Sequence, residues 1–407
     1  MQQMSINQFA VLFVDAVLLI SALGLVILSL VLLGECIAAL FPLACVANGS
    51  QNPKVAVLVP AHNEELVIGS TLLDIKSQLK NEHRLIVIAD NCSDRTAEIA
   101  SAAGATVIER HDLMLRGKGY ALDYGIKFLS CDPPDVVVFV DADCRVHQGA
   151  IASLTQSAIA TKRPVQATYL MAKPTNSSPK ESISVFAFKV KNLVRARGLT
   201  QLKLPCLLTG TGMAFPWSVI RSVDLATGYI VEDMKLSLDL TIAGHPPIFC
   251  PQANITGNFP QQKRAVTSQR TRWEHGHLQT LLTYVPLLFK AAIHQQRLDL
   301  LMSALDMSLP PLSLLVVIWL ALMTSSLLFG VLAALWMPAI LLATAGLFLL
   351  TAIFTAWVKF GSQDLPLGEL LTIPFYIFWK IPLYLKFLVQ PQSSWVRTER
   401  EINKPVG

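Results

Sequence analysis

The sequence predicts an α/β domain with a doubly wound sheet, placed between apolar segments that cross a membrane. The chain of 407 residues is 53% hydrophobic, with a mean hydropathy of +0.49, and only 15% charged, whereas soluble globular proteins carry about 25% charge. Both ends are nearly bare of charge, while residues 50–300 have an ordinary soluble composition. In that middle region, β-branched runs alternate with segments of helical spacing, which is typical of a parallel sheet covered by helices.

The first apolar segment, residues 9–41, predicts one tilted membrane helix. Only Asp15, Glu35 and a few small polar residues interrupt it, and about 20 apolar residues suffice to cross a bilayer. A signal peptide would need a basic start and a shorter apolar core, but residues 1–8 contain no lysine or arginine. A tight hairpin of two helices is the alternative, although no proline or charged turn divides the segment.

Two more spans are expected at residues 312–335 and 339–358. The linker between them is uncharged, whereas Lys359 directly follows the second span. Because basic residues collect on the cytoplasmic side of a membrane, we expect an inner or plasma membrane protein with residues 50–300 in the cytoplasm. The net charge of +5 suits an anionic membrane surface. No basic-aromatic stripe indicates a nucleic-acid partner.

Two further stretches, residues 284–293 and 367–388, are apolar but broken by prolines and lysines. Aromatic residues and lysines mixed in this way favour helices that lie in the membrane interface. The second stretch is also long enough to form a third C-terminal span. The expected division is a transmembrane helix at 1–47, a cytoplasmic domain at 48–283, interfacial helices at 284–311, two transmembrane helices at 312–358, and an interfacial or transmembrane segment with a cytoplasmic tail at 359–407.

Polar residues follow the strands of the predicted domain, where ligands bind to parallel sheets. We expect strands at 54–59, 84–89, 106–108 and 135–140, with helices at 66–79, 97–103 and 119–128. Asp141 and Asp143 end the fourth strand. Two carboxylates on alternate residues supply hard oxygen ligands, which suit Mg²⁺ or Mn²⁺ bridging a diphosphate. The seven cysteines form no CxxC pair, so a disulfide framework or zinc site is not expected.

Five motifs occur in the order seen in family 2 glycosyltransferases: VAVLVPAHNEE, VIADNCSDRT, VVVFVDADC, Glu232-Asp233, and the sequence QRTRW at 269–273. The chain most resembles the membrane-integrated branch, which includes the cellulose, chitin-oligosaccharide and hyaluronan synthases and ceramide glucosyltransferase. The resemblance covers about residues 50–280. It implies a GT-A fold, a doubly wound mixed sheet that binds a nucleotide sugar, usually a UDP-sugar, with a divalent cation.

The resemblance also implies roles on the donor side. In the segment that begins at Pro60, Glu64 is similar to a residue that contacts the ribose. His62 stands where many relatives have an aromatic residue, so it either stacks on the base or is a loop histidine without a ligand. Asp90 resembles the residue that reads the uracil edge.

The diphosphate has its own expected residues. Asp143 resembles the metal ligand, and Asp141 either contacts the nucleotide or supports the metal. Lys118, in the segment between these motifs, is expected to offset diphosphate charge, although a lysine in a surface loop would look the same.

On the acceptor side, Gly210, Thr211 and Gly212 resemble a loop that lines the acceptor site, where glycines permit close approach of a sugar ring. After residue 233, apolar residues occur at every second position, which would by itself suggest a strand. The resemblance favours a helix there. Inverting transfer needs a carboxylate to deprotonate the acceptor hydroxyl. The resemblance assigns this role to Asp233, with Glu232 as its neighbour.

Gln269, Arg272 and Trp273 are spaced to share one helix face. Arginine can pair with the diphosphate leaving group and tryptophan offers a flat face to a sugar, while a simple amphipathic helix on the membrane would fit the same spacing. A basic segment at 186–202 either binds anionic lipid or a lipid diphosphate or, as we prefer, is a solvated helix face.

The expected function is an inverting glycosyltransferase that moves a UDP-hexose or UDP-N-acetylhexosamine unit to a lipid-linked or polysaccharide acceptor. Processive synthesis is one alternative. It needs a channel for the polymer, and about three spans would enclose such a channel only together with partner subunits or further copies of the chain in a homo-oligomer. The other alternative is an inactive membrane assembly subunit.

Overall fold

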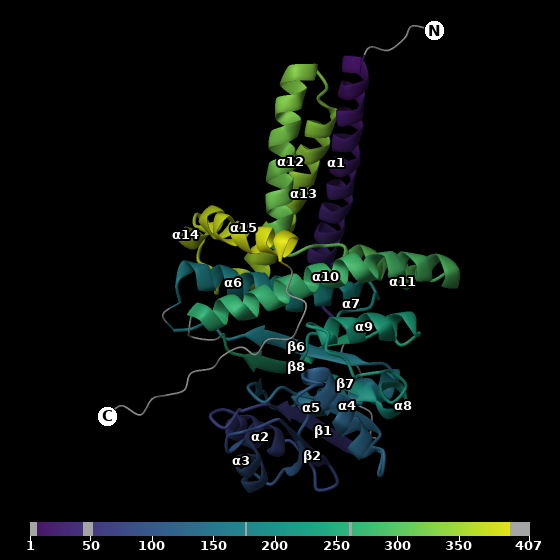
Figure 1. Cartoon of the computed structure of the whole chain (residues 1–407), viewed down its shortest axis with the longest axis vertical. Helices are drawn as coiled ribbons and strands as arrows, with labels where there is room; N and C mark the ends of the chain where they lie inside the picture. The colour runs from purple at the N-terminus through teal and green to yellow at the C-terminus, as the bar shows by residue number, and fades with distance from the viewer. Residues whose placement is uncertain (1–5, 44–51, 176, 260–262, 391–407) are drawn as a thin grey trace.

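The computed structural model describes residues 6–43, 52–175, 177–259 and 263–390. Figure 1 shows an α/β domain at one end, a bundle of long helices at the other, and several helices lying across the base of the bundle. Cys45 and the expected cytoplasmic tail at 391–407 lie outside the described residues.

The first half of the sheet is parallel and confirms the alternation of strand and helix. Its strands stand in the order β3-β2-β1-β4. The elements are β1 (Val55–Ala61), α2 (Ile68–Lys76), β2 (Arg84–Asp90), α3 (Thr96–Ala102), β3 (Thr106–Arg110), α4 (Lys118–Leu129) and β4 (Val136–Phe139).

The second half makes the sheet mixed, as the family resemblance implied. Strand β7 (Met213–Pro216) pairs antiparallel with β4 and also with β6, whereas β6 and β8 run parallel to each other. The two-residue strand β5 closes this edge. The remaining elements of this half are β5 (Arg145–Val146), α5 (Ala150–Thr161), β6 (Val165–Met171), α8 (Trp217–Ile220), α9 (Glu232–Ile242) and β8 (Ile248–Gly257).

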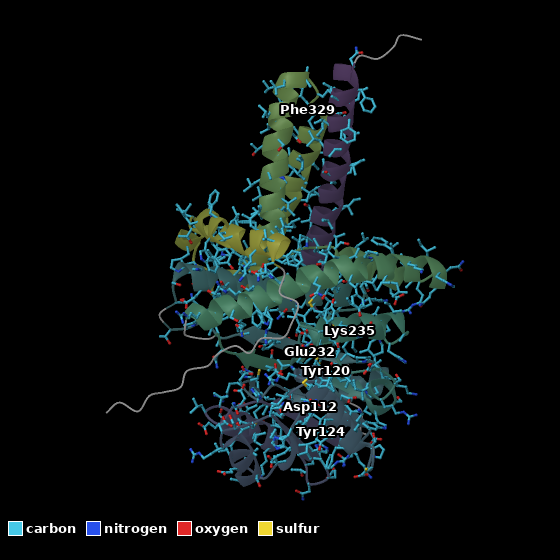
Figure 2. All side chains as sticks on the ribbon, in the orientation of Figure 1. Asp112, Tyr120, Tyr124, Glu232, Lys235 and Phe329 are labelled. Atoms are coloured by element: carbon cyan, nitrogen blue, oxygen red, sulfur yellow. The ribbon has the colours of Figure 1, made fainter. Side chains whose placement is uncertain are left out.

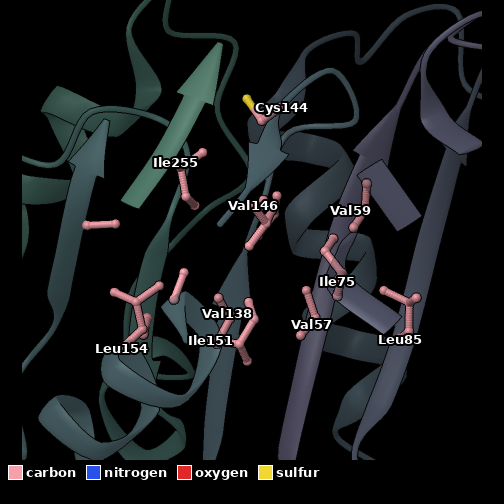
Figure 3. Packing of buried hydrophobic residues seen from close by; sticks show 14 of the residues in the cluster. Val57, Val59, Ile75, Leu85, Val138, Cys144, Val146, Ile151, Leu154 and Ile255 are labelled. Atoms are coloured by element: carbon pink, nitrogen blue, oxygen red, sulfur yellow. The ribbon is translucent and has the colours of Figure 1, made fainter. Parts of the chain in front are cut away.

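Both faces of the sheet are buried, which explains the continuous apolar runs of its strands. Val57 and Val59 of β1 pack toward α2 and α5, where Ile75 and Leu154 are fully buried, and Figure 3 shows this cluster. Leu58 points the other way, into a second cluster with α4 and α9. Each fully buried side chain of this size contributes about 1.5–3 kcal/mol, so the sheet is a firm platform for the loops at its edge.

Within the described residues, three helices are long and apolar enough to cross a membrane: α1 (Ile6–Ala38), α12 (Leu312–Ala333), and α13 (Met337–Ala356), which continues into the π-helical turn η2 (Trp357–Gly361). The N-terminal segment is one helix of 33 residues, so the hairpin alternative is wrong. Figure 1 shows the three helices side by side, and buried residues of α1 and α13 share one cluster.

The helices at the base of the bundle include α10 (Lys263–Gln295), α11 (Leu298–Met307), α14 (Leu367–Leu370) and α15 (Ile373–Val389). Helix α10 runs without a break across residue 283, where we expected one domain to end, and contains Pro286. Helix α15 is not among the helices that qualify as spans. Figure 1 shows it lying across the base of the bundle, which favours the interfacial alternative for residues 367–388.

The basic segment at 186–202 begins in α6 (Pro179–Lys189) and continues through the π-helical turn η1 (Val190–Arg195) and α7 (Ala196–Gln201). Our preferred interpretation, a solvated basic face, is wrong for Arg195. Its guanidinium is buried and bonds both Glu35 at 2.8 Å and Asp306 at 2.5 Å. This ion triad joins α1, η1 and α11.

Candidate active site

The carboxyl end of β2 brings the expected base-reading residue into a buried ion pair. Arg110 ends β3 directly opposite Asp90, and its Nη1 donates to Asp90 Oδ1 at 2.7 Å. Burial raises the pKa of Asp90, while the guanidinium of Arg110 acts in the opposite direction. Sequence reasoning missed Arg110. The sequence did contain one signal for it. Arg110 follows the strand expected at 106–108, and Asp90 follows the strand expected at 84–89, which precedes it in the chain.

The loop after β1 packs against the same strand end. His62 Nδ1 donates to the backbone oxygen of Asp90 at 2.6 Å, and the Glu64 amide donates to Thr96 Oγ1 at 2.7 Å. Pro60 lies within β1, opposite Ile88 of β2. The structure therefore brings together the residues expected on the nucleoside side, and the contact between His62 and Asp90 gives the histidine a fixed position beside the expected base.

Lys118 connects the acidic strand end to the acceptor loop. From the first turn of α4, its Nζ forms an ion pair with Asp141 and donates to the Gly210 carbonyl at 2.6 Å. Burial disfavours the charge on Lys118, but the carboxylates of Asp141 and Glu232 raise its pKa. The lysine is therefore not a surface-loop residue, since it bonds both Asp141 and the 210–212 loop.

Asp141, Asp143 and Cys144 place three potential ligand atoms within 4.8 Å of one another. Burial raises the pKa of the Cys144 thiol, so the thiol is held in its neutral form. Oxygen-rich donors fit Mg²⁺ or Mn²⁺. The arrangement suits the expected metal site, and both carboxylates are partly exposed in the segment that follows β4.

Two glycines with positive φ and one buried glutamine determine the conformation of the loop at 210–212. Gly210 and Gly212 have φ values of +92° and +65°, which other residues adopt at a cost. Gln166 of β6 donates to the Thr211 carbonyl at 2.9 Å and accepts from the Thr209 amide at 2.9 Å. Sequence reasoning missed Gln166, whose only signal was an amide inside a buried strand.

The expected base and its neighbour lie across this loop. Helix α9 begins at Glu232, so the helix favoured by the resemblance is correct. A Cβ atom placed on Gly210 would lie 3.3 Å from Asp233 Oδ2, which shows how closely the loop approaches this carboxylate. Burial and the Asp233 carboxylate raise the pKa of Glu232 to about 7. Figure 2 places Glu232 between the sheet and the helices under the bundle.

Trp273 of α10 lies among aromatic residues of α6 and β6. The Trp273 ring lies 5.7 Å from Phe188, which lies 5.4 Å from Tyr169. Gln269 Oε1 and Arg272 Nε are buried and have no hydrogen-bond partner within the described residues. Within the described residues, no hydrogen bond or ion pair joins Gln269 or Arg272 to Asp141 or Asp233. The two α10 side chains therefore do not bond these carboxylates directly.

Comparison with known families identifies this arrangement. A family model described as "Glycosyltransferase like family 2" matches residues 53–276. This chain belongs to glycosyltransferase family 2. The matched region contains the strand ends, Lys118, the 210–212 loop, α9 and the first part of α10.

Curated relatives of this family 2 glycosyltransferase include two bacterial proteins. The probable glycosyltransferase YdaM of Bacillus subtilis is 26% identical over 257 residues, which cover 60% of each chain. The poly-β-1,6-N-acetyl-D-glucosamine synthase of Staphylococcus aureus is 26% identical over 239 residues, covering 56% of this chain and 55% of the relative. The chain thus spans little more than half the length of these relatives.

Among solved structures, the mannosyltransferase PcManGT of Pyrobaculum calidifontis, in complex with GDP-Man and Mn²⁺, is similar with a TM-score of 0.54. The two sequences are 16% identical, and the alignment covers 84% of this chain and 99% of that one. This likeness shows the GT-A fold.

Proposed function

We propose that this family 2 glycosyltransferase inverts the donor sugar while transferring it from a UDP-sugar to a lipid-linked or polysaccharide acceptor of the cell envelope. One observation carries the proposal. The loop at 210–212 lies between two carboxylates. The Gly210 carbonyl accepts a hydrogen bond from Lys118, which also pairs with Asp141. The same glycine lies close to Asp233. A diphosphate-side carboxylate and a second carboxylate therefore flank a single loop.

We assign the base role to Asp233 on this geometry. In an inverting transfer, the acceptor oxygen attacks the anomeric carbon as its proton leaves, so the base must lie on the acceptor side of the sugar. Asp233 lies in the first turn of α9, where the helix dipole favours a negative charge. The ammonium of Lys191, in η1, lies within electrostatic reach of Asp233.

The donor diphosphate is assigned to the other side of the loop. Asp143 and Asp141 would hold Mg²⁺ or Mn²⁺, and a bound divalent cation supplies positive charge against the diphosphate. Lys118 fixes the orientation of Asp141 and adds a second positive charge. Arg272 has a buried nitrogen without a partner in the described residues, which suits pairing with the leaving UDP. Trp273 offers its face to the acceptor sugar.

We further propose that the domain faces the cytoplasm and that the enzyme adds one or a few sugars. Only three helices qualify as spans in the described residues, and three helices enclose little space for a growing polymer. Processive synthesis is the second candidate, favoured by the similarity to the staphylococcal synthase. It would require a channel completed by further subunits or copies.

A donor screen tests the proposal. Purified full-length protein in nanodiscs is incubated with UDP- and GDP-sugars, native membrane extract as acceptor source and Mg²⁺ or Mn²⁺, while nucleotide release and product mass are followed together. We expect UDP release and a product of inverted anomeric configuration, both lost with EDTA and with Asp143→Asn. Release of GDP alone would contradict the donor assignment, and full turnover in EDTA would contradict the metal assignment.

A further inference from the structure

Helix α15 has two chemically different faces. Its apolar face is solvent-exposed in the protein itself, with Phe375, Phe378 and Leu388 exposed to 75%, 67% and 78%. The opposite face buries Tyr376, Lys380 and other residues against the protein. A helix of this kind lies in the membrane interface, with its apolar face toward the acyl chains. Its buried face therefore lies at about the depth of the lipid headgroups.

Three cations from three helices meet around a tryptophan of this helix. Lys180 Nζ of α6 lies 2.9 Å from the centroid of the Trp379 ring, and Arg270 Cζ of α10 lies 5.5 Å from it. Lys380, the next residue of α15, forms an ion pair with Glu274 of α10. Trp379 itself is 38% exposed, so it forms the rim of this cluster, which we call the Trp379 cluster.

The arginine of the Trp379 cluster has no hydrogen bond or ion pair to a carboxylate within the described residues. Arg270 is only 6% exposed, and its Nη2 donates to the uncharged Ser184 hydroxyl at 2.7 Å. Its Nη1 is buried without a hydrogen-bond partner in the described residues. Leaving such a charged donor unpaired is costly, which indicates that the site is incomplete without a ligand.

The two acids nearby are already engaged. Glu274 pairs with Lys380, and Glu181 is held at the start of α6, where its carboxylate accepts from the Ser178 amide and hydroxyl, each at 2.7 Å. In the described part of the chain, Glu181 attracts Arg270 electrostatically but forms no hydrogen bond with it. Within the described residues no carboxylate bonds Arg270 Nη1, so a bound anion would supply the missing acceptor.

We propose that the Trp379 cluster binds the headgroup phosphate of an anionic phospholipid from the leaflet that faces the catalytic domain. Interfacial tryptophans sit at headgroup depth, and arginine is suited to phosphate oxygens. The acyl chains of the same lipid would lie along the exposed face of α15, beside the spanning helices. Arg270 is on α10 next to Gln269 and two residues from Arg272, so the bound lipid would also hold that part of α10 in place.

The test uses the full-length protein in detergent and monodisperse short-chain phospholipids as probes. Phosphatidylglycerol and phosphatidylcholine are titrated separately, and binding is followed by calorimetry and by the shift in melting temperature. We expect phosphatidylglycerol to bind at least tenfold more tightly than phosphatidylcholine, and Arg270→Gln to remove most of that difference, because a charged hydrogen bond of this kind is worth about tenfold or more in affinity.

Two further variants keep the outcome clear. Lys180→Gln, at the partly exposed rim, should weaken phosphatidylglycerol binding severalfold even where Arg270→Gln folds poorly. Lys386→Gln removes an exposed cation from the same helix and should change nothing. The proposal fails when both lipids bind wild-type protein equally, or when Lys180→Gln and Lys386→Gln behave alike. Tight binding of a polyprenyl phosphate with no binding of phosphatidylglycerol would also overturn it, since the site would then belong to an acceptor.

Discussion

Asp233 is the residue on which the proposed chemistry depends most directly. Replacing it with asparagine keeps the size of the side chain but removes the proton acceptor, so turnover should fall by about 10²–10⁴-fold. Donor affinity should stay near normal, because the base acts only in the transition state. A calorimetric UDP titration and a turnover assay on the same preparation measure both quantities.

The matched control is Asp132→Asn, an exposed aspartate in the surface ion pair with Arg84, which should leave both quantities unchanged. Near-normal turnover of Asp233→Asn at saturating acceptor would exclude Asp233 as the base and direct attention to Glu232.

Glu232 gives a pH-dependent signature in the metal-free protein. Its pKa is raised to about 7 in the folded state from an ordinary value near 4.5, so the folded protein binds this proton more tightly than the unfolded chain. The free energy of unfolding should therefore decrease as pH rises from about 4.5 to 7, by an amount on the order of 3 kcal/mol. Melting curves between pH 5 and 8 measure the trend, and Glu232→Gln should flatten it. An unchanged slope in that variant would mean that another group causes the trend.

Individual site residues differ in how far the sequence predicts them. Asp90, Asp141 and Asp143 follow strands of a parallel sheet, so topology alone brings them to one edge. Arg110 reaches Asp90 only through the register of β2 and β3. Gln166 reaches the 210–212 loop from a strand in the mixed half of the sheet. Such contacts depend on the pairing of distant segments, which a local pattern does not contain.

At the scale of elements, the strands and helices of the first half-sheet were predicted to within a few residues, because the strands are continuous apolar runs and the helices have apolar residues at helical spacing. The mixed half of the sheet was harder to predict from the sequence. Strand β7 has four residues and β5 has two, too few for a periodic signal. The continuity of α10 across Pro286 also escaped prediction, since a proline usually ends or bends a helix.

The contact between α7 and α1 permits a test at the same scale. A Cβ atom on Gly198 would lie 2.1 Å from the backbone oxygen of Glu35, so Gly198→Ala must push the two helices apart. We expect a loss of about 3 kcal/mol or more, seen as a lower melting temperature and less monodisperse protein in detergent. Gly368→Ala, at a position with open space around its Cβ, should behave like the wild type. Equal stability of the two variants would mean that this contact adapts readily.

For the whole molecule, the prediction to test is the side of the membrane on which the catalytic domain lies. Cys131 is exposed, whereas Cys144 is buried, so of these two Cys131 is the suitable labelling site. An impermeant maleimide should label Cys131 in permeabilised cells but not in intact cells. Met337→Cys in a Cys131→Ser background should give the reverse result in intact cells, because Met337 begins α13 beside the linker expected outside. Labelling of Cys131 from outside intact cells would invert the proposed orientation.

The triad of Glu35, Arg195 and Asp306 also has a consequence for biosynthesis. The ribosome makes α1 first, and Arg195 follows Glu35 by 160 residues. At about 5–20 residues per second, that distance takes about 8–32 seconds of translation. During this interval the Glu35 carboxyl, at the end of a nascent membrane helix, lacks the arginine that pairs with it. Helix α1 therefore lies in the bilayer before its ion pair with Arg195 can form. Its final packing is delayed until most of the catalytic domain has left the ribosome.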